Sequence, residues 1–360
     1  MKGRLFAVSE ESRKSSIDKM ELSIFVPEPE GKLLWFKTLQ DIASDLFQLD
    51  IGDYAFLWEE KTKNIYGVYR IISKPFYKQE KNHNDIFKVK IEPAYNFKNP
   101  IQEYDIVNNP YMKNRLWNIV GKKISGKPRG TTPITEDEIS FLIQSFINVN
   151  TEYQFFPQTE EKKIKNELKF DLSGDEVNLP NSLAEYKYHN IRIVKGNEVH
   201  YEKALEGLLN LLIRNKKTKE LKQLDINIEE IKWYANYLPY GLDRTEMDYM
   251  IQESIDGQTI TKIDVIELMI TIIDVDHIKR CCQYARWASD SLANGKNIIR
   301  PIMICSNKSI DSINGFKNPS IKKALQDYPE DYNVPKIDVF TYKIINSKIS
   351  FDKYVSNDYR

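Results

Sequence analysis

The chain has 360 residues, of which 41% are hydrophobic, 12% aromatic and 29% charged. This composition supports a sizeable folded core and excludes disorder or fibrous structure as the main state. The 52 Lys and Arg residues balance the 52 Asp and Glu residues, so any site for a polyanion has to come from local clustering of charge.

The length favours two domains over one. No stretch approaches the length of a membrane span, and residues 1–14 lack the apolar run of a secretory signal, so we expect a cytoplasmic protein. The three cysteines, Cys281, Cys282 and Cys305, are too few for a disulfide framework or a four-thiolate zinc site. We interpret them as small buried side chains.

The first third of the chain predicts a mixture of helix and strand. Apolar residues at helical spacing predict a helix over residues 35–49. Strands are then predicted at residues 52–58, 65–72 and 87–92. Thr135 and Glu138 have the spacing of a capping box, which predicts the start of another helix.

The C-terminal half predicts an α/β order with a mixed sheet. Helices are predicted at residues 201–213 and 278–292, and strands at residues 247–253, 259–270, 298–305 and 337–344. Asp256-Gly257 separates the first two strands and is a strong hairpin signal. Residues 149–195 are rich in polar and turn-forming residues, so we expect a linker there between domains at 1–148 and 196–360.

Acidic residues occupy both predicted strands of this hairpin. Asp248 and Glu267 have apolar neighbours, and burying two carboxylates without a partner costs several kcal/mol. Mg²⁺ or Mn²⁺ is the natural counter-charge, because hard cations prefer oxygen ligands. Such an ion polarises a phosphodiester and generates hydroxide from water. Glu202 and Glu206 lie one turn apart and share a side of the preceding helix.

This order of elements resembles the PD-(D/E)XK nuclease superfamily over residues 202–305, and within it the NucS-like and RecB-like domains. The segment Arg280-Cys-Cys-Gln-Tyr-Ala-Arg-Trp287 is similar to the family's Gln-x-x-x-Tyr-x-x-Trp helix. The resemblance implies that Asp248 and Glu267 bind the metal and that Glu202 or Glu206 assists from the helix.

The sequence departs from the family two residues after the second acid, where Met269 replaces the usual Lys. Lys262 on the same strand, or Lys279 or Arg280 on the next helix, are candidates to supply the missing charge. Otherwise the domain binds DNA without cutting it, or the two acids are structural. His277 is a candidate metal ligand or a histidine without a function.

The segments Gly52-Asp-Tyr-Ala-Phe-Leu-Trp58 and Ile65-Tyr-Gly-Val-Tyr69 resemble the PUA-like superfamily, especially its EVE and YTH branches, over residues 1–148. The resemblance implies a barrel with a pocket in which a flipped base stacks on aromatic rings. Trp35, Trp58 and Tyr66 are our candidates for the pocket wall.

Six basic and no acidic residues lie between Tyr111 and Gly130, and the glycines there allow the backbone to approach a phosphate chain closely. Within this segment we expect phosphate contacts from Lys122, Lys123, Lys127 and Arg129.

We therefore expect two domains, an N-terminal PUA-like α+β barrel and a C-terminal α/β PD-(D/E)XK-like mixed sheet with flanking helices. The function that follows is a modification-dependent DNA endonuclease, similar to type IV restriction enzymes, with DNA carrying modified bases as partner and a homodimer for cutting both strands. The alternatives are a sensor that binds nucleic acid without cutting, and an RNA-directed protein. The chain has no Gly-x-x-x-x-Gly-Lys-Ser/Thr loop, so nucleotide-driven translocation would need another chain.

Overall fold

The computed structural model describes residues 2–24, 32–78, 86–125, 130–173, 190–240, 245–293 and 295–354. They form two compact units. Unit 1 contains the described residues up to Lys169 together with Asn190, Ile191 and Thr245, and unit 2 contains the others. Among these residues, no helix combines the length and the apolar character needed to cross a membrane.

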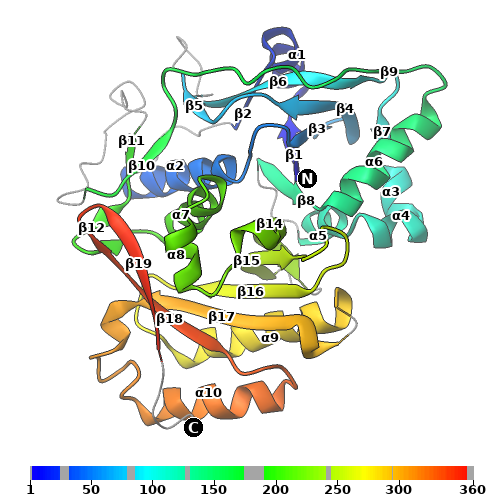
Figure 1. Ribbon diagram of the computed structural model, residues 1–360. Coiled ribbons are helices and arrows are strands. Elements are labelled where there is room, and N and C mark those ends of the chain that lie inside the picture. The colour runs from blue at the N-terminus through cyan, green and yellow to red at the C-terminus, as the bar shows by residue number, and fades with distance from the viewer. Residues whose placement is uncertain are drawn as a thin grey trace. The chain divides into compact units, whose positions relative to one another are not determined.

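Unit 1 is a curled sheet with helices packed on it (Figure 1). Its strands are β1 (Gly3–Val8), β2 (Glu21–Ser23), β3 (Tyr54–Glu59), β4 (Asn64–Ile71), β5 (Phe76–Tyr77), β6 (Phe87–Asn96), β7 (Ile101–Gln102), β8 (Thr131–Ile134) and β9 (Gln154–Phe155). Its helices are α1 (Glu10–Lys19), α2 (Lys32–Phe47), α3 (Glu103–Asn108), α4 (Pro110–Arg115), α5 (Trp117–Ser125) and α6 (Glu136–Val149).

The path through this sheet runs β2-β6-β4-β3-β1-β8, with β1 and β3 parallel. The long strand β6 pairs with β2 and β5 along its first half and with β4 and β9 along its second half, and this change of partners goes with the curl. Phe56, Ile65, Leu142 and Phe146 belong to a fully buried core between the sheet and α6. The curled sheet fits a PUA-like domain, as the sequence predicted.

Gly67 interrupts β4 with a left-handed backbone, at a φ of +57°. The registers of β4 with β3 and with β6 both shift near this point. A Cβ at Gly67 would collide with the ring of Tyr69, which packs directly over the glycine. The Tyr-Gly-Val-Tyr segment is therefore a kinked strand whose second tyrosine covers the kink.

Unit 2 is built on a six-stranded mixed sheet in the order β14-β15-β16-β17-β18-β19. The strands are β14 (Ile231–Tyr240), β15 (Thr245–Glu253), β16 (Lys262–Leu268), β17 (Ile299–Ser306), β18 (Asp338–Ile345) and β19 (Lys348–Lys353). The helices are α7 (Glu202–Arg214), α8 (Thr218–Gln223), α9 (Val275–Ser291) and α10 (Pro319–Asp331), and the 3-10 turns are η2 (Ile228–Glu230), η3 (Lys296–Ile298) and η4 (Asn307–Ser309). Two small sheets complete the chain, β10 (Lys169–Asp171) with β11 (Asn190–Arg192) and β12 (Val194–Lys195) with β13 (Glu198–Val199).

The sheet of unit 2 has helices on both faces. Figure 1 shows α9 and α10 on one face and α7 and α8 on the other. The strands β16, β17 and β18 are parallel, whereas β15 and β19 run antiparallel to their neighbours. Residues on both sides of β17 are buried, as expected for a central strand covered twice. This is the flanked mixed sheet that the sequence predicted, and whether it is a PD-(D/E)XK fold stays a prediction.

Several predicted elements are confirmed. The hairpin of β15 and β16 turns at Asp256, whose side chain accepts hydrogen bonds from the backbone of Gln258 and Thr259. The capping box is present. The backbone N–H of Glu138 donates to the Thr135 hydroxyl, and the backbone N–H of Thr135 donates to the Glu138 carboxylate. The sequence did not predict β14, β19 or α10.

The kink in β4 gives a testable prediction. Gly67→Ala should destabilise unit 1 by about 1–3 kcal/mol, because alanine disfavours a positive φ and its methyl group displaces Tyr69. Gly257→Ala is the matched control, because Gly257 has a φ of +72° but open space around it, so only the backbone strain applies and the cost should be smaller. Hydrogen exchange measures both costs, in the β3 and β4 amides for Gly67→Ala and in the β15 and β16 amides for Gly257→Ala. Equal costs would contradict the role of Tyr69.

Candidate functional site

Helix α7 carries the first two acidic residues of the site. Glu202 is its first residue and is half-buried, whereas Glu206, one turn later, is fully buried. Glu206 accepts hydrogen bonds from Lys203 and from Asn236 of β14, the latter at 2.8 Å. The hydroxyl of Tyr249 on β15 donates to Asn210 of the same helix at 2.7 Å. These buried contacts fix the acidic turn of α7 against the sheet.

Asp248 of β15 completes a compact group of carboxylates. One oxygen from each of Glu202, Glu206 and Asp248 lies within 4.8 Å of the others. Asp248 is 7% exposed, and its Oδ2 accepts the backbone N–H of Leu268 at 2.9 Å. Three oxygen atoms at this spacing are suited to a hard divalent cation.

Glu267 lies beside this group on β16. The β15–β16 register pairs Tyr249 with Ile266, and its continuation by one residue places Asp248 opposite Glu267. Burial raises the pKa of Glu267 well above its ordinary value, and the negative charges of Asp248 and Glu202 raise it further. The structure therefore brings together Glu202, Glu206, Asp248 and Glu267. Their role in metal binding stays a prediction.

The cation that contacts Glu267 comes from α9. Arg280 donates from Nη2 to Glu267 Oε1, and its guanidinium opposes the rise in the pKa of Glu267. His277 lies one turn earlier on α9, with Nε2 3.9 Å from Glu267 Oε1 and Nδ1 2.7 Å from Asp274 Oδ1. Asp274 is the N-cap of α9, whose first residue, Val275, lies three residues before the helix start that we predicted.

A cleft of about 510 Å³ opens at the carboxyl ends of β16 and β17. Residues 270–274 line it together with Glu198, Ser306 and Lys308. Asp274 belongs to its wall and bonds to His277, which in turn faces Glu267. The cleft is therefore adjacent to the acidic group, at the end of the sheet where ligands of α/β proteins commonly bind.

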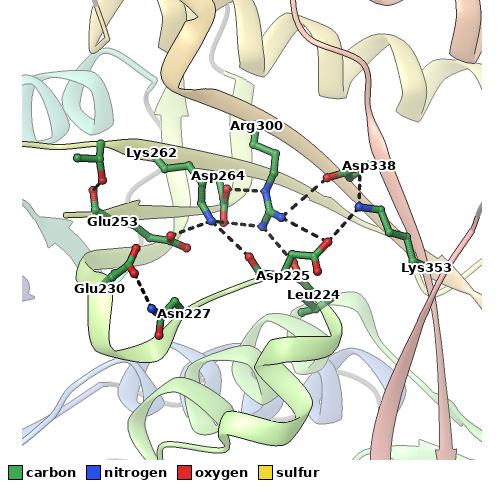
Figure 2. A network of polar contacts seen from close by, with 11 residues as sticks. Leu224, Asp225, Asn227, Glu230, Glu253, Lys262, Asp264, Arg300, Asp338 and Lys353 are labelled. Carbon is green, nitrogen blue, oxygen red and sulfur yellow. Dashed lines mark hydrogen bonds and ion pairs between the residues drawn. The ribbon is translucent and has the colours of Figure 1, made fainter. Parts of the chain in front are cut away.

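Lys262 lies elsewhere in unit 2. It is five residues before Glu267 on β16, which is about 16 Å along an extended strand. Its Nζ pairs with Glu253 at 2.7 Å and with Asp264 at 3.7 Å (Figure 2). Lys262 is at the start of β16 and the acidic group is at its other end. The structure therefore does not bring Lys262 to the acidic group.

Lys262 belongs to a network that crosses the amino ends of the parallel strands. Arg300 binds both oxygens of Asp264, from Nε at 2.8 Å and from Nη2 at 2.9 Å. Lys353 bridges Asp225 and Asp338, at 3.0 Å to each (Figure 2). The network ties β16, β17, β18 and β19 to the segment that follows α8, so we assign it a structural role.

The remaining predicted features of unit 2 are apolar. Met269 is 1% exposed, and its backbone N–H donates to Ile304. All three cysteines are buried, as predicted, and burial raises the pKa of Cys282 and Cys305 to about 12. Thiols with such a pKa stay protonated at neutral pH and are poor nucleophiles.

In unit 1, two predicted pocket-wall residues are half-buried and already in contact with cations. The Trp58 ring has Lys63 Nζ at 4.5 Å and donates from Nε1 to Glu103 at 2.8 Å. The Tyr66 ring has the Arg13 guanidinium at 4.2 Å. Trp58 pairs with Ile65, whereas Leu57 pairs with Tyr66, so the two rings project from opposite faces of the sheet. The structure does not bring them into one wall.

Other candidates lie outside the part that the structure describes. Lys127 and Arg129 fall between the described ranges. The backbones of Trp35, Lys122 and Lys123 belong to α2 and α5, but their side chains are not among those described.

A buried carboxyl group holds the start of α5. Glu138 accepts the backbone N–H of Asn118 at 2.8 Å and the Asn118 side-chain amide at 3.1 Å, in addition to its capping bonds. Burial raises the pKa of Glu138 to about 7. The sequence identified Glu138 as a capping residue, and only the fold places it against α5, the helix whose backbone includes Lys122 and Lys123.

Comparison with known proteins identifies the N-terminal region. Residues 8–145 match the model of the EVE domain, so unit 1 contains an EVE domain. No curated protein matches the chain.

Similar solved structures each cover about 40% of the chain. A hypothetical protein from Leishmania major is 8% identical and covers 41% of this chain and 96% of its own, with a TM-score of 0.30. A protein from Rhodopseudomonas palustris is 17% identical and covers 40% and 92%, with a TM-score of 0.27. Human THYN1 protein, solved in complex with 5-methylcytosine containing DNA, is 14% identical and covers 41% and 98%, with a TM-score of 0.28.

The buried Glu138 carboxyl predicts a pH-dependent stability. Its folded pKa lies above the ordinary value of 4.5, so its contribution is fully present below pH 4.5 and is lost as the pH rises to about 7. Glu138→Gln should remove this loss, which is of the order of 3 kcal/mol for a shift of this size. Urea unfolding at pH 4.5 and pH 7.5 measures it. Asp137→Asn, at an exposed neighbour, is the control and should keep the wild-type difference in the free energy of unfolding between the two pH values. The same difference in Glu138→Gln would contradict the role assigned to Glu138.

Proposed function

We propose that the protein is a modification-dependent DNA endonuclease, in which the EVE domain reads a modified base and unit 2 hydrolyses the phosphodiester with Mg²⁺ or Mn²⁺. The observation that carries the hydrolytic part is the approach of Glu202, Glu206 and Asp248 within 4.8 Å of one another. The EVE match supports the reading part.

The residues present fit a divalent cation. The three carboxylates supply oxygen ligands. Lys203 neutralises Glu206, and Arg280 neutralises the neighbouring Glu267. A divalent ion would add the positive charge needed to bring a phosphodiester to this acidic position, and it would lower the pKa of a bound water. The half-buried Glu202 and the cleft beside Asp274 leave the group open on one side.

Met269 favours a second candidate, a sensor that binds nucleic acid without cutting it. The position of the usual lysine is occupied by an apolar side chain that is 1% exposed. In that case the acidic group would be structural, and the protein would bind DNA or RNA through unit 1 alone.

Asp248→Asn tests the hydrolytic proposal. Asparagine keeps an oxygen for the Leu268 N–H but removes the charge, so Mn²⁺ binding and plasmid cleavage should fall at least about 100-fold while DNA affinity stays nearly unchanged. Calorimetry with Mn²⁺ and cleavage of plasmids with and without 5-methylcytosine measure these effects. Asp352→Asn, an exposed residue of β19, is the control. Wild-type protein that binds no Mn²⁺ and cuts no plasmid would leave the sensor as the function.

Neutralising the basic segment tests the reading proposal. Replacing Lys122, Lys123 and Arg129 with Gln should weaken DNA binding and reduce the slope of log K against log salt, by up to about 0.9 for each lost phosphate contact. Lys14→Gln, an exposed lysine of α1, should leave the slope unchanged. The same slope in both variants would exclude phosphate contacts from this segment. Competition with structured RNA separates DNA from RNA as the ligand.

A further inference from the structure

The Glu267–Arg280 pair has two buried polar atoms that the protein does not satisfy. Glu267 is fully buried, and its Oε1 bonds to Arg280, but its Oε2 has no hydrogen-bond partner among the described residues. Arg280 Nε is buried and, within the same part of the chain, also lacks an acceptor. A buried polar atom without a partner costs about 1–3 kcal/mol, so two in one ion pair indicate a ligand.

The position of the pair defines the chemistry of that ligand. Glu267 lies opposite Asp248, a member of the group of three carboxylates. The Arg280 side chain is 43% exposed although its Nε is buried, so solvent reaches this side chain beside the acidic group. An acceptor that is both next to a metal and within reach of a guanidinium is an oxyanion.

We propose that Arg280 binds a non-bridging phosphate oxygen of the substrate and that Glu267 is a positioning residue, not a metal ligand. This inference rests on the proposed function. Nε donates to the phosphate oxygen, while Nη2 keeps its bond to Glu267. Oε2 of Glu267 accepts from a water molecule bound to the phosphate or the metal. The metal is then held by Glu202, Glu206 and Asp248, and Arg280 supplies the positive charge that Met269 does not.

Inorganic phosphate and Mn²⁺, tested on the full chain, separate this inference from the proposed function. Wild-type protein loaded with Mn²⁺ should bind phosphate, and Arg280→Gln should weaken that binding about 10- to 100-fold while Mn²⁺ affinity changes less than threefold. Arg286→Gln is the matched control, because Arg286 is on the same helix and pairs with exposed Asp290, and it should bind phosphate as wild type does.

Two further variants guard against a purely structural effect. Arg280→Lys should recover part of the phosphate affinity, and guanidinium chloride at a concentration of tens of millimolar should restore part of the cleavage by Arg280→Ala. Glu267→Gln should keep Mn²⁺ binding but lower phosphate binding, because the guanidinium loses the carboxylate that holds it.

The outcomes are distinguishable. Unchanged phosphate binding in Arg280→Gln overturns the inference and leaves the metal centre standing. Loss of Mn²⁺ binding in Glu267→Gln, comparable to that in Asp248→Asn, also overturns it by making Glu267 a metal ligand. If wild-type protein binds no Mn²⁺, the proposed function fails, and phosphate binding that still depends on Arg280 would preserve an anion site alone.

Discussion

Burial of acidic side chains is the constraint on which unit 2 depends. Glu206, Asp264 and Glu267 are fully buried, and each would destabilise the fold by several kcal/mol without compensation. At the amino ends of the parallel strands the compensation is nearly complete, since Arg300 binds both oxygens of Asp264. Of the other buried acid there, Glu253, one oxygen pairs with Lys262 and the other has no partner in the described ranges.

The carboxyl end of the same sheet is compensated differently. Lys203 and Arg280 hold two of the acids, yet the Glu267–Arg280 pair keeps an acceptor and a donor unused by the described protein groups. In the described part of the amino-end network the Arg300–Asp264 pair uses both carboxylate oxygens, and the atom left over is a single acceptor, Glu253 Oε1, with no unused donor beside it. We therefore interpret the amino end as a clamp on the strands and the carboxyl end as a site shaped for a ligand.

Local patterns in the sequence predicted many of the helices and strands. Asp256-Gly257 predicted the β15–β16 hairpin, and the Thr135–Glu138 spacing predicted the start of α6. The pattern failed at β14, where apolar residues on both faces and Pro239 obscure the alternation of a strand. It also failed at α10, whose Pro329 lies inside the helix and reads as a helix breaker.

The sequence could not predict which basic residue pairs with Glu267, because the pairing depends on how α9 packs against the sheet. In sequence, Lys262 is on the same strand as Glu267, whereas Arg280 is on the next helix. Extended backbone carries Lys262 about 16 Å away, and the crossover after β16 brings Arg280 back over the strand. Sequence proximity along a strand is therefore a poor guide to the partners of a buried acid.

Our proposal that a helix arginine takes the place of the strand lysine has a physical consequence. The backbone of Met269 still bonds to β17, and its buried side chain adds apolar packing where a lysine would have placed a charge. An ammonium group on a flexible stem has no fixed direction, whereas a guanidinium held through Nη2 by a buried carboxylate presents its Nε in one orientation. A site of this kind would depend on the Glu267–Arg280 bond for its geometry. In our proposal, the carboxylate that the family resemblance assigned to the metal orients the arginine.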